Sequence, residues 1–399
     1  MHSFNSLDPD DTLTKSLFHK VLVAFYAPAG WPDGLVALAG AALAAGVAAV
    51  WGLVAGDGML AAIVAAILLA FFAADAYILW LLPRRRVSFG PWKGQLFALA
   101  LPRAAVALVL GLLGLGVGWT AALLLAVAAQ FAGTAVLYRA ALIEPRRLSL
   151  TQLVVATDRL ARTAQPIRIL HISDLHLERP GEREELLLEL SRAAKPDLIL
   201  ITGDYVNLSY NLDATTFASL RDLLGRLSAR YGVFGVLGSP PVDLRSAIPP
   251  LFSDLPVRLL RNEAIEVTLS RGRRVTLLGL DCHHDIGRDR ATLAEVAAAA
   301  PGGGPRVLLY HSPELMPDAV ALGIDLYLCG HTHGGQVRLP GIGALLTASQ
   351  LGRRYVMGHY QEGRTHLYVS RGVGFEGLSA PRVRLFCPPE VTMVELGGE

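Results

Sequence analysis

Two long apolar stretches constrain this chain more than any other feature of its sequence. In residues 35–82 the only charged residues are Asp57 and Asp75, and in residues 94–138 the only one is Arg103. A glycine-containing turn near the middle divides each stretch, and each half can cross about 30 Å of hydrocarbon as a helix. Burial in a large soluble core is rejected because the Ala, Leu and Val runs have no polar face. The sequence therefore predicts four transmembrane helices.

The basic residues around these helices predict their orientation. They lie in the N-terminal arm, in the loop between the second and third helices, and after the fourth helix: Lys15, Lys20, Arg84, Arg85, Arg86, Lys93, Arg139, Arg146 and Arg147. The other two loops contain no Lys or Arg. By the positive-inside rule both termini are cytoplasmic. This predicts a multi-pass protein of the cytoplasmic (inner) membrane, with its C-terminal half facing the cytoplasm.

Two ionisable residues lie at or near membrane depth. Such residues are functional by default, so Asp75 and Arg103 raise the hypothesis of a small-solute transporter with a regulatory domain. However, Arg103 follows Pro102 and can also mark the start of the third helix, and a single Asp does not make an ion pathway. Transport is therefore the least favoured of three hypotheses for function.

After residue 165 the sequence changes to short apolar runs that alternate with charged helical patterns. Strands are predicted at 167–172, 197–202, 233–237, 275–280, 307–310 and 325–328, and helices at 183–194, 215–227, 292–300 and 313–322. This alternation predicts an α/β fold with a largely parallel sheet. The three cysteines are scattered, so they form neither a disulfide framework nor a Cys-based zinc site.

Polar residues follow the predicted strands at the points where the strands end. They include two aspartates and four histidines: Asp174, His176, Asp204, His311, His331 and His333. The carboxyl ends of parallel strands meet at one edge of a sheet, so these side chains are expected to converge. Such a ligand set suits zinc, iron or manganese, with Asp204 placed to bridge two ions.

This ordered set resembles the calcineurin-like metallophosphoesterase superfamily. The match covers about residues 166–399 and rests on the motifs DLH at 174–176, GD at 203–204 and GHTHGGQ at 330–336. The tail and the membrane-anchored layout look most like a bacterial branch that includes enzymes cleaving UDP-2,3-diacylglucosamine in lipid A synthesis. The resemblance implies a four-layer αββα sandwich, here preceded by an all-α four-helix transmembrane domain.

The resemblance also implies a role for each motif residue. Asp174, His176, Asp204 and His333 would hold one divalent ion, and Asp204, His311 and His331 would hold the other. The ions would be Mn, Zn or Fe. A hydroxide activated by the metal would attack phosphorus, which makes Asp204 and His331 catalytic as well as ligands.

One motif departs from the family pattern. Where the family has Gly-Asn-His, this chain has Gly-Ser-Pro at 238–240. Ser239 can still offer an oxygen to the metal, but Pro240 can neither bind metal nor donate a proton. His283 and His284 follow another predicted strand and are candidates to replace the missing imidazole; His283 is taken as the catalytic one, and a plain polar loop is the alternative.

The sequence thus predicts a cytoplasmic arm (1–34), a transmembrane domain (35–143), a connector (144–165) and a metallophosphoesterase domain (166–399). The predicted activity is hydrolysis of a phosphodiester or pyrophosphate bond in a phosphorylated, lipid-linked substrate at the membrane. The alternative is an impaired domain that binds a phosphorylated ligand and signals without turnover. Nucleic acid is not expected as a partner, because the C-terminal half has no long basic run.

Overall fold

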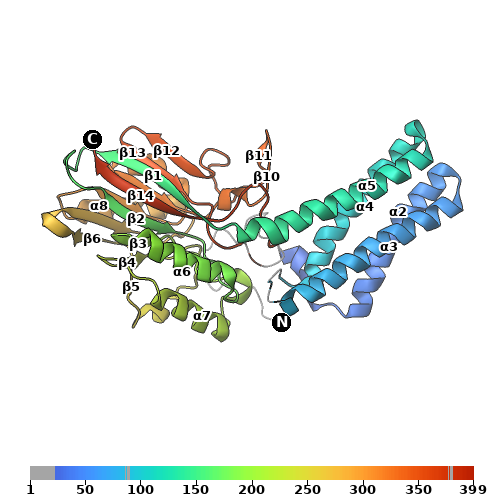
Figure 1. Ribbon diagram of the computed structural model, residues 1–399, viewed down its shortest axis with the longest axis horizontal. Helices are drawn as coiled ribbons and strands as arrows, with labels where there is room; N and C mark the ends of the chain where they lie inside the picture. Colours follow the sequence, from blue (N-terminus) through green and yellow to red (C-terminus); the bar gives the residue numbers. More distant parts are fainter. Residues whose placement is uncertain (1–22, 86, 88–89, 376, 378–380) are drawn as a thin grey trace. The chain divides into compact units, whose positions relative to one another are not determined.

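The computed structural model describes residues 23–399, apart from 86, 88–89, 376 and 378–380 (Figure 1). The predicted cytoplasmic arm therefore lies largely outside the described residues, as do Lys15, Lys20 and Arg86. The chain divides into two compact units. We call them the helical unit, the described part of residues 23–143 with 377–382, and the sheet unit, the described part of residues 144–376 and 383–399, and describe each by itself.

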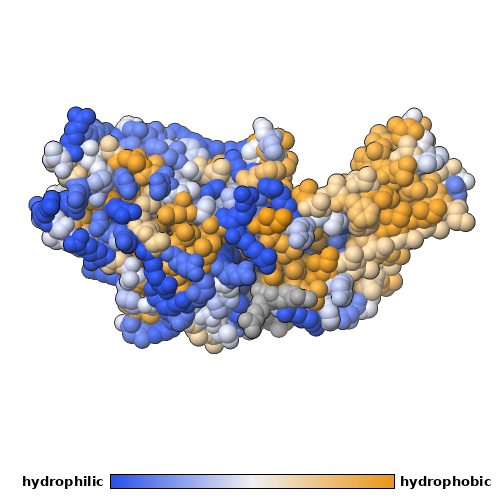
Figure 2. All heavy atoms as spheres, in the orientation of Figure 1, coloured by the Kyte–Doolittle hydropathy of each residue, from blue (hydrophilic) through white to orange (hydrophobic). Residues whose placement is uncertain are grey.

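The helical unit contains four long helices. They are α2 (Asp33–Ala55), α3 (Gly58–Leu81), α4 (Trp92–Val117) and α5 (Trp119–Tyr138). Each is long and apolar enough to cross a membrane, which confirms the prediction of four apolar helices. Their outer faces are apolar (Figure 2), with side chains such as Leu53 at 83% exposure and Leu115 at 70%. Such faces are typical of helices that contact lipid rather than water.

The first acidic residue of the apolar stretch caps a helix. The side chain of Asp57 accepts hydrogen bonds from the backbone N–H groups of Met59 (2.8 Å) and Leu60 (3.2 Å) at the start of α3. Gly56 ends the preceding helix α2 with φ +68°, a conformation that glycine adopts without strain. Asp57 therefore has a structural role in the turn.

The second acidic residue belongs to a buried polar cluster between helices. The Arg103 guanidinium donates to both carboxylate oxygens of Asp75, at 2.7 and 2.9 Å. It also donates to the side chains of Gln130 (3.2 Å) and Thr134 (2.9 Å). Arg103 lies within α4, eleven residues from its first residue, rather than at the start of the helix. We call these four residues the helical cluster.

The sheet unit contains two six-stranded sheets. The first has the order β1 (Ser149–Thr157), β14 (Glu390–Gly398), β2 (Ile167–Ile172), β3 (Leu198–Ile201), β4 (Val233–Gly235) and β5 (Val257–Leu259). The second has the order β12 (Gly358–Glu362), β13 (Thr365–Val369), β9 (Leu326–Cys329), β8 (Arg306–Leu309), β7 (Arg274–Gly279) and β6 (Glu263–Thr268). A two-stranded hairpin pairs β10 (Arg338–Leu339) with β11 (Gly343–Ala344).

Successive side chains of a strand point to opposite faces of its sheet, so each sheet contributes to a core on both faces. In β2, Ile167 and Ile169 join the core between the two sheets, whereas Leu170 and Ile172 join the core under the helices α6 (Glu182–Ala194) and α7 (Ala214–Gly225). A third core lies between the second sheet and the helices α8 (Ile286–Ala299) and α9 (Met316–Ala321). The predicted four-layer αββα sandwich is confirmed, since helices cover the outer faces of two packed sheets.

The strand pairing shows which strands the sequence pattern did not predict. The strands β2 to β5 run parallel, as expected, and so do β7, β8, β9 and β13. Antiparallel strands β14, β12 and β6 complete the sheets. β1, within the region expected to be a connector, pairs in parallel with β14 over nine residues. Residues 149–157 are therefore part of the first sheet.

Candidate metal centre

The Asp and His residues singled out in the sequence follow the carboxyl ends of four parallel strands. Asp174 and His176 follow β2 and Asp204 follows β3 in the first sheet, while His311 follows β8 and two further histidines follow β9 in the second. All six side chains are at most 6% exposed. We call them the Asp/His cluster: Asp174, His176, Asp204, His311, His331 and His333.

The cluster contains two groups of side chains that can hold a metal ion. In the first group, Asp174, His176 and His333 place one ligand atom each within 4.8 Å of one another; in the second, Asp174, Asp204 and His311 do the same. Asp174 thus belongs to both groups, and Asp204, a member of the second, also reaches the first, because its Oδ2 is 3.4 Å from His176 Nε2 and 3.2 Å from His311 Nε2. The Nε2 atoms of His176 and His333 are 3.0 Å apart.

The hydrogen bonds show that these residues fit a cation. His311 donates from Nδ1 to the carbonyl oxygen of Thr202 (2.7 Å), so in the neutral ring the lone pair of Nε2 faces the Asp204 carboxylate. Asp174 Oδ2 is buried and has no hydrogen-bond donor among the described residues. Acceptors that face one another in a dry interior repel unless positive charge lies between them. Divalent cations supply that charge, and carboxylate with imidazole is a common donor set for them.

The backbone of the cluster is strained. Asp174, His176, Asp204, His331 and His333 all have positive φ, between 39° and 68°. This region is uncommon for residues with a Cβ atom and costs of the order of 1 kcal/mol or more per residue. Strain at five neighbouring positions indicates that the fold holds these side chains for a purpose other than packing.

Two glycines allow the loops to approach the aspartates. A Cβ atom on Gly330 would lie 2.0 Å from Asp174 Oδ2, and one on Gly238 would lie 2.1 Å from Asp204 Oδ1. Neither position can carry a side chain without displacing a carboxylate. The glycines that precede His331 and Ser239 are therefore part of the construction of the cluster.

Burial controls protonation in the cluster. It raises the pKa of Asp174 to about 7, opposed by the charge of His311 and reinforced by Asp204. It lowers the pKa of His333 well below the ordinary value, and His176 and Arg384 add to that effect. Without a cation these shifts favour a protonated Asp174 carboxyl and a neutral His333 imidazole. Neutral imidazole is the form that binds metal.

The altered motif places Ser239 against Asp204. The backbone N–H of Ser239 donates to Asp204 Oδ1 (2.7 Å), and its hydroxyl lies 3.5 Å from Oδ2. His284, rather than His283, lies beside this serine, with Nε2 3.2 Å from its hydroxyl oxygen. His283 instead directs Nδ1 to Asp289 in α8, at 2.8 Å. The structure thus brings His284 to the cluster and does not bring His283.

Two residues that support the cluster were not predicted. The Asp243 carboxylate accepts three backbone hydrogen bonds, from Asp204 (2.8 Å), Tyr205 (2.9 Å) and Gly238 (2.7 Å). Burial raises its pKa to about 7, with Asp204 adding to the shift. The only signal for Asp243 in the sequence is its position, three residues after the altered motif at 238–240.

The other support is a buried guanidinium. Arg384 is fully buried and donates to the backbone carbonyl oxygens of Arg371 (2.6 Å), Gly374 (2.5 Å) and His333 (3.3 Å). It ties the loop after β13 to the loop after β9. No local sequence pattern identifies Arg384 as part of the site, because it lies far along the chain from the motifs that form the Asp/His cluster.

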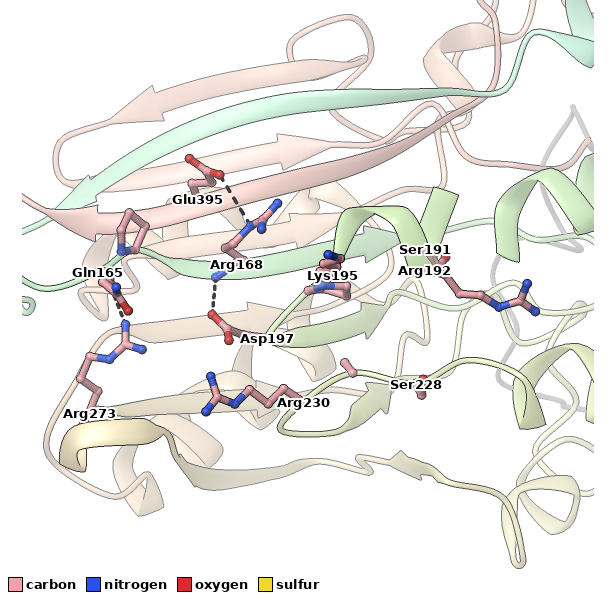
Figure 3. Close-up of a pocket in the computed structure, with 13 residues that line it drawn as sticks. Gln165, Arg168, Ser191, Arg192, Lys195, Asp197, Ser228, Arg230, Arg273 and Glu395 are labelled. Carbon is pink, nitrogen blue, oxygen red and sulfur yellow. Dashed lines mark hydrogen bonds and ion pairs between the residues drawn. The ribbon is translucent and has the colours of Figure 1, made fainter. Parts of the chain in front are cut away.

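A separate cavity of about 950 Å³ lies at the opposite ends of the strands (Figure 3). Its lining includes residues that precede or begin β2, β3 and β4, such as Arg168, Asp197 and Arg230. Arg168 is paired with Glu395 across the neighbouring strand β14, at 3.7 Å. None of the Asp/His cluster lines this cavity.

Comparisons with known proteins agree with the site. A sequence profile of the calcineurin-like phosphoesterases matches residues 167–335. The phosphodiesterase YaeI of Escherichia coli is 34% identical over 239 residues, which cover 58% of this chain and 83% of that protein. The uncharacterized metallophosphoesterase YkuE of Bacillus subtilis is 28% identical over 261 residues, 64% of this chain and 87% of that protein.

A solved structure from Thermus thermophilus matches 52% of this chain and 90% of its own, with 13% identity and a TM-score of 0.35. The chain belongs to the calcineurin-like phosphoesterase family, as the motifs predicted. The names of these relatives specify no substrate of lipid A synthesis. That part of the resemblance stays a prediction.

Proposed function

We propose that this protein is a two-metal phosphoesterase that hydrolyses a phosphodiester or pyrophosphate bond. The observation that carries the proposal is the arrangement of Asp204, whose Oδ2 faces His176 on one side and His311 on the other, 3.4 and 3.2 Å away. A carboxylate between two groups of acceptors is placed to bridge two cations. When bound, such a pair of ions supplies positive charge that polarises a phosphoryl group and activates water.

The residues of the site would have two kinds of role, binding the ions and positioning the ligands. Asp174, His176 and His333 would hold the first ion, and His311 with His331 would hold the second, with Asp204 between the two. Ser239 would keep Asp204 in place through its backbone N–H. Asp243 would hold the turn that carries Asp204 through three hydrogen bonds.

The loop at 238–240 limits the choice of substrate. Pro240 cannot donate a proton to a departing oxygen, and a missing general acid typically lowers a rate about 10² to 10⁴-fold. Substrates whose leaving group needs little protonation, such as a nitrophenolate or a nucleotide phosphate, should react by this factor faster than alkyl esters.

The test uses the full chain in detergent with bis(p-nitrophenyl) phosphate. We expect hydrolysis that EDTA abolishes and Mn²⁺ restores, with a much slower reaction on a dialkyl phosphate. His359→Ala is the control variant, because His359 lies on β12 and pairs with His366 (2.9 Å) rather than with the cluster. A metal-loaded protein that turns over no activated ester would contradict the proposal and favour the ligand-binding, signalling alternative.

We further propose that the four apolar helices anchor the enzyme in the cytoplasmic membrane with the sheet unit facing the cytoplasm. Anchoring confines enzyme and substrate to one surface, which suits an amphiphilic, lipid-linked phosphodiester or pyrophosphate. The basic residues that flank the helices support this orientation. Alkaline phosphatase fused after Glu399 should be inactive in cells, whereas a cytoplasmic reporter at the same position should be active. The reverse pattern would contradict the proposed orientation of the helices.

A further inference from the structure

A third imidazole lies beside two predicted ligands of the second ion. The loop after β7 carries His284, which is 4% exposed. Its ring centroid is 4.4 Å from that of His331 and 6.2 Å from that of His311, and those two are 5.1 Å apart. The three rings come from three neighbouring strands of the second sheet, β7, β8 and β9.

These separations suit a shared ion. Zinc–nitrogen bonds are about 2.1 Å and a ring centroid lies about 1.1 Å beyond its nitrogen, so two imidazoles on one tetrahedral ion have centroids about 5.2 Å apart. The His284–His331 and His311–His331 pairs, at 4.4 and 5.1 Å, lie near this value, and the His284–His311 pair, at 6.2 Å, would have to close by about 1 Å. His176 and His333 in the first group are 4.8 Å apart.

The fold holds the loop of His284 from several sides. Arg245 donates to the carbonyl oxygen of Cys282 and also to that of Gly238 (3.0 Å), which joins this loop to the altered motif. Gln350 donates to the carbonyl oxygen of His284 (2.9 Å). The backbone of His284 has φ +56°, the same uncommon region that the residues of the Asp/His cluster adopt.

The altered motif leaves room for such a replacement. The family's Asn would complete the shell of the second ion, and Ser239 has a shorter side chain. The Ser239 hydroxyl lies between His284 Nε2 (3.2 Å) and Asp204 Oδ2 (3.5 Å). The imidazole therefore approaches the Asp204 carboxylate from the side of Ser239, the position at which the family motif has its Asn.

We propose that His284 is a ligand of the second metal ion, together with Asp204, His311 and His331, in place of the Asn that this chain lacks. Three imidazoles and a carboxylate restore the number of ligands that this ion has in the family, and an ion that expands to five ligands keeps a position open for water. The inference rests on the proposed two-metal function, and the His284 ring would turn from Ser239 toward Asp204 on binding.

The test measures metal content rather than turnover. Full-length protein in detergent is loaded with Zn²⁺ or Mn²⁺, and bound ions are counted by mass spectrometry after gel filtration. We expect two ions per chain in the wild type and about one in His284→Phe, which keeps a ring but cannot ligate. The Kd of the second ion should rise at least about 10-fold, since even partners outside the ligand shell contribute that much.

His283→Phe is the matched control, because the neighbouring side chain bonds Asp289 instead; it should keep both ions. Adding Ser239→Asn to His284→Phe should restore part of the second-site affinity by supplying the family's ligand. Far-UV circular dichroism of the metal-free proteins checks that each variant folds. If His284→Phe does not fold, the same measurements are made on His284→Leu.

The outcomes separate this inference from the function it rests on. Two ions bound by a folded His284 variant with the wild-type Kd would overturn the inference, even if its activity were low, and would leave the two-metal function standing. A wild type that binds no ions would overturn the proposed function itself.

Discussion

The two units each bury a cluster of charged side chains, and they differ in how the polar atoms are satisfied. In the helical cluster, Arg103 donates to both oxygens of Asp75, and Gln130 and Thr134 accept its remaining hydrogen bonds. In the Asp/His cluster, His311 Nε2 faces a carboxylate oxygen at 3.2 Å. The first cluster is complete as it stands, and the second needs a cation.

The difference shows what a buried charge means. A paired Asp and Arg carry no net charge, and their hydrogen bonds offset much of the cost of leaving water. In the Asp/His cluster the described partners of Asp174 include no such guanidinium: burial raises its pKa to about 7, the charge of His311 opposes the shift and that of Asp204 reinforces it. A buried charged residue therefore points to a ligand only where its neighbours fail to neutralise it.

The largest expected effect is the loss of both ions from the Asp/His cluster. Asp204→Ala removes the carboxylate that faces both groups and should leave no bound metal, whereas His311→Ala should empty only the second position. Activity should fall more than about 100-fold in both variants, since even partners outside the ligand shell contribute up to that much. Metal analysis and hydrolysis of the nitrophenyl ester check this.

The matched variant in the other cluster is Asp75→Asn, which removes a buried carboxylate just as Asp204→Ala does. It should leave the metal content at two ions per chain. If both Asp204→Ala and His311→Ala keep wild-type metal content, the Asp/His cluster is structural and the contrast with the helical cluster disappears.

The next effect is on the stability of the helical unit. Arg103→Leu leaves the Asp75 carboxylate buried without its partner, which typically destabilises a protein by about 3–5 kcal/mol. Replacing both residues with leucine should recover most of this loss, because an apolar pair carries no desolvation penalty. Unfolding in detergent, followed by circular dichroism, measures both variants.

A destabilisation that persists in the double leucine variant would show that the pair determines helix packing by more than mutual neutralisation. An Arg103→Leu variant as stable as the wild type would mean that the Asp75 side chain does not depend on its guanidinium partner, so the contrast between the two clusters would be lost.

The sequence predicts best what depends on local pattern. The strand at 167–172 was predicted to the residue, because its apolar residues alternate toward two cores. The Asp/His cluster was predicted as well, since each member closely follows an apolar strand. Parallel strands bring their carboxyl ends together whatever the length of chain between them.

What the sequence could not predict depends on contacts between distant residues. The pairing of β1 with β14 joins segments more than 230 residues apart, and nothing near residue 149 indicates it. The ion pair of Asp75 and Arg103 joins two helices, so each residue alone looked like an isolated charge. The choice of His284 over His283 depends on a left-handed backbone at His284, which the residue type does not indicate.

The smallest expected effect concerns His171, a buried imidazole next to the Asp/His cluster that resembles neither cluster fully. Its Nε2 contacts the Thr202 hydroxyl (2.8 Å), but its Nδ1 is buried with no hydrogen-bond partner among the described residues. Burial lowers its pKa from the usual 6.5 to about 3. Below pH 6.5 the unfolded chain therefore binds a proton here that the folded chain does not, so this residue makes stability fall as the pH falls, down to about pH 3.

The slope for one such group is about 1.4 kcal/mol per pH unit. We expect His171→Phe to reduce the dependence of the unfolding free energy on pH by about this amount between pH 6 and 5. Both proteins are measured in EDTA, so that the other buried histidines contribute equally and bound metal contributes nothing. The difference between the two proteins above pH 7 gives the packing effect of the substitution, which does not depend on pH. Equal slopes would mean that His171 in the folded protein takes up its proton near pH 6.5. The unpartnered Nδ1 of His171 would then cost the fold no more than the fully hydrogen-bonded helical cluster does.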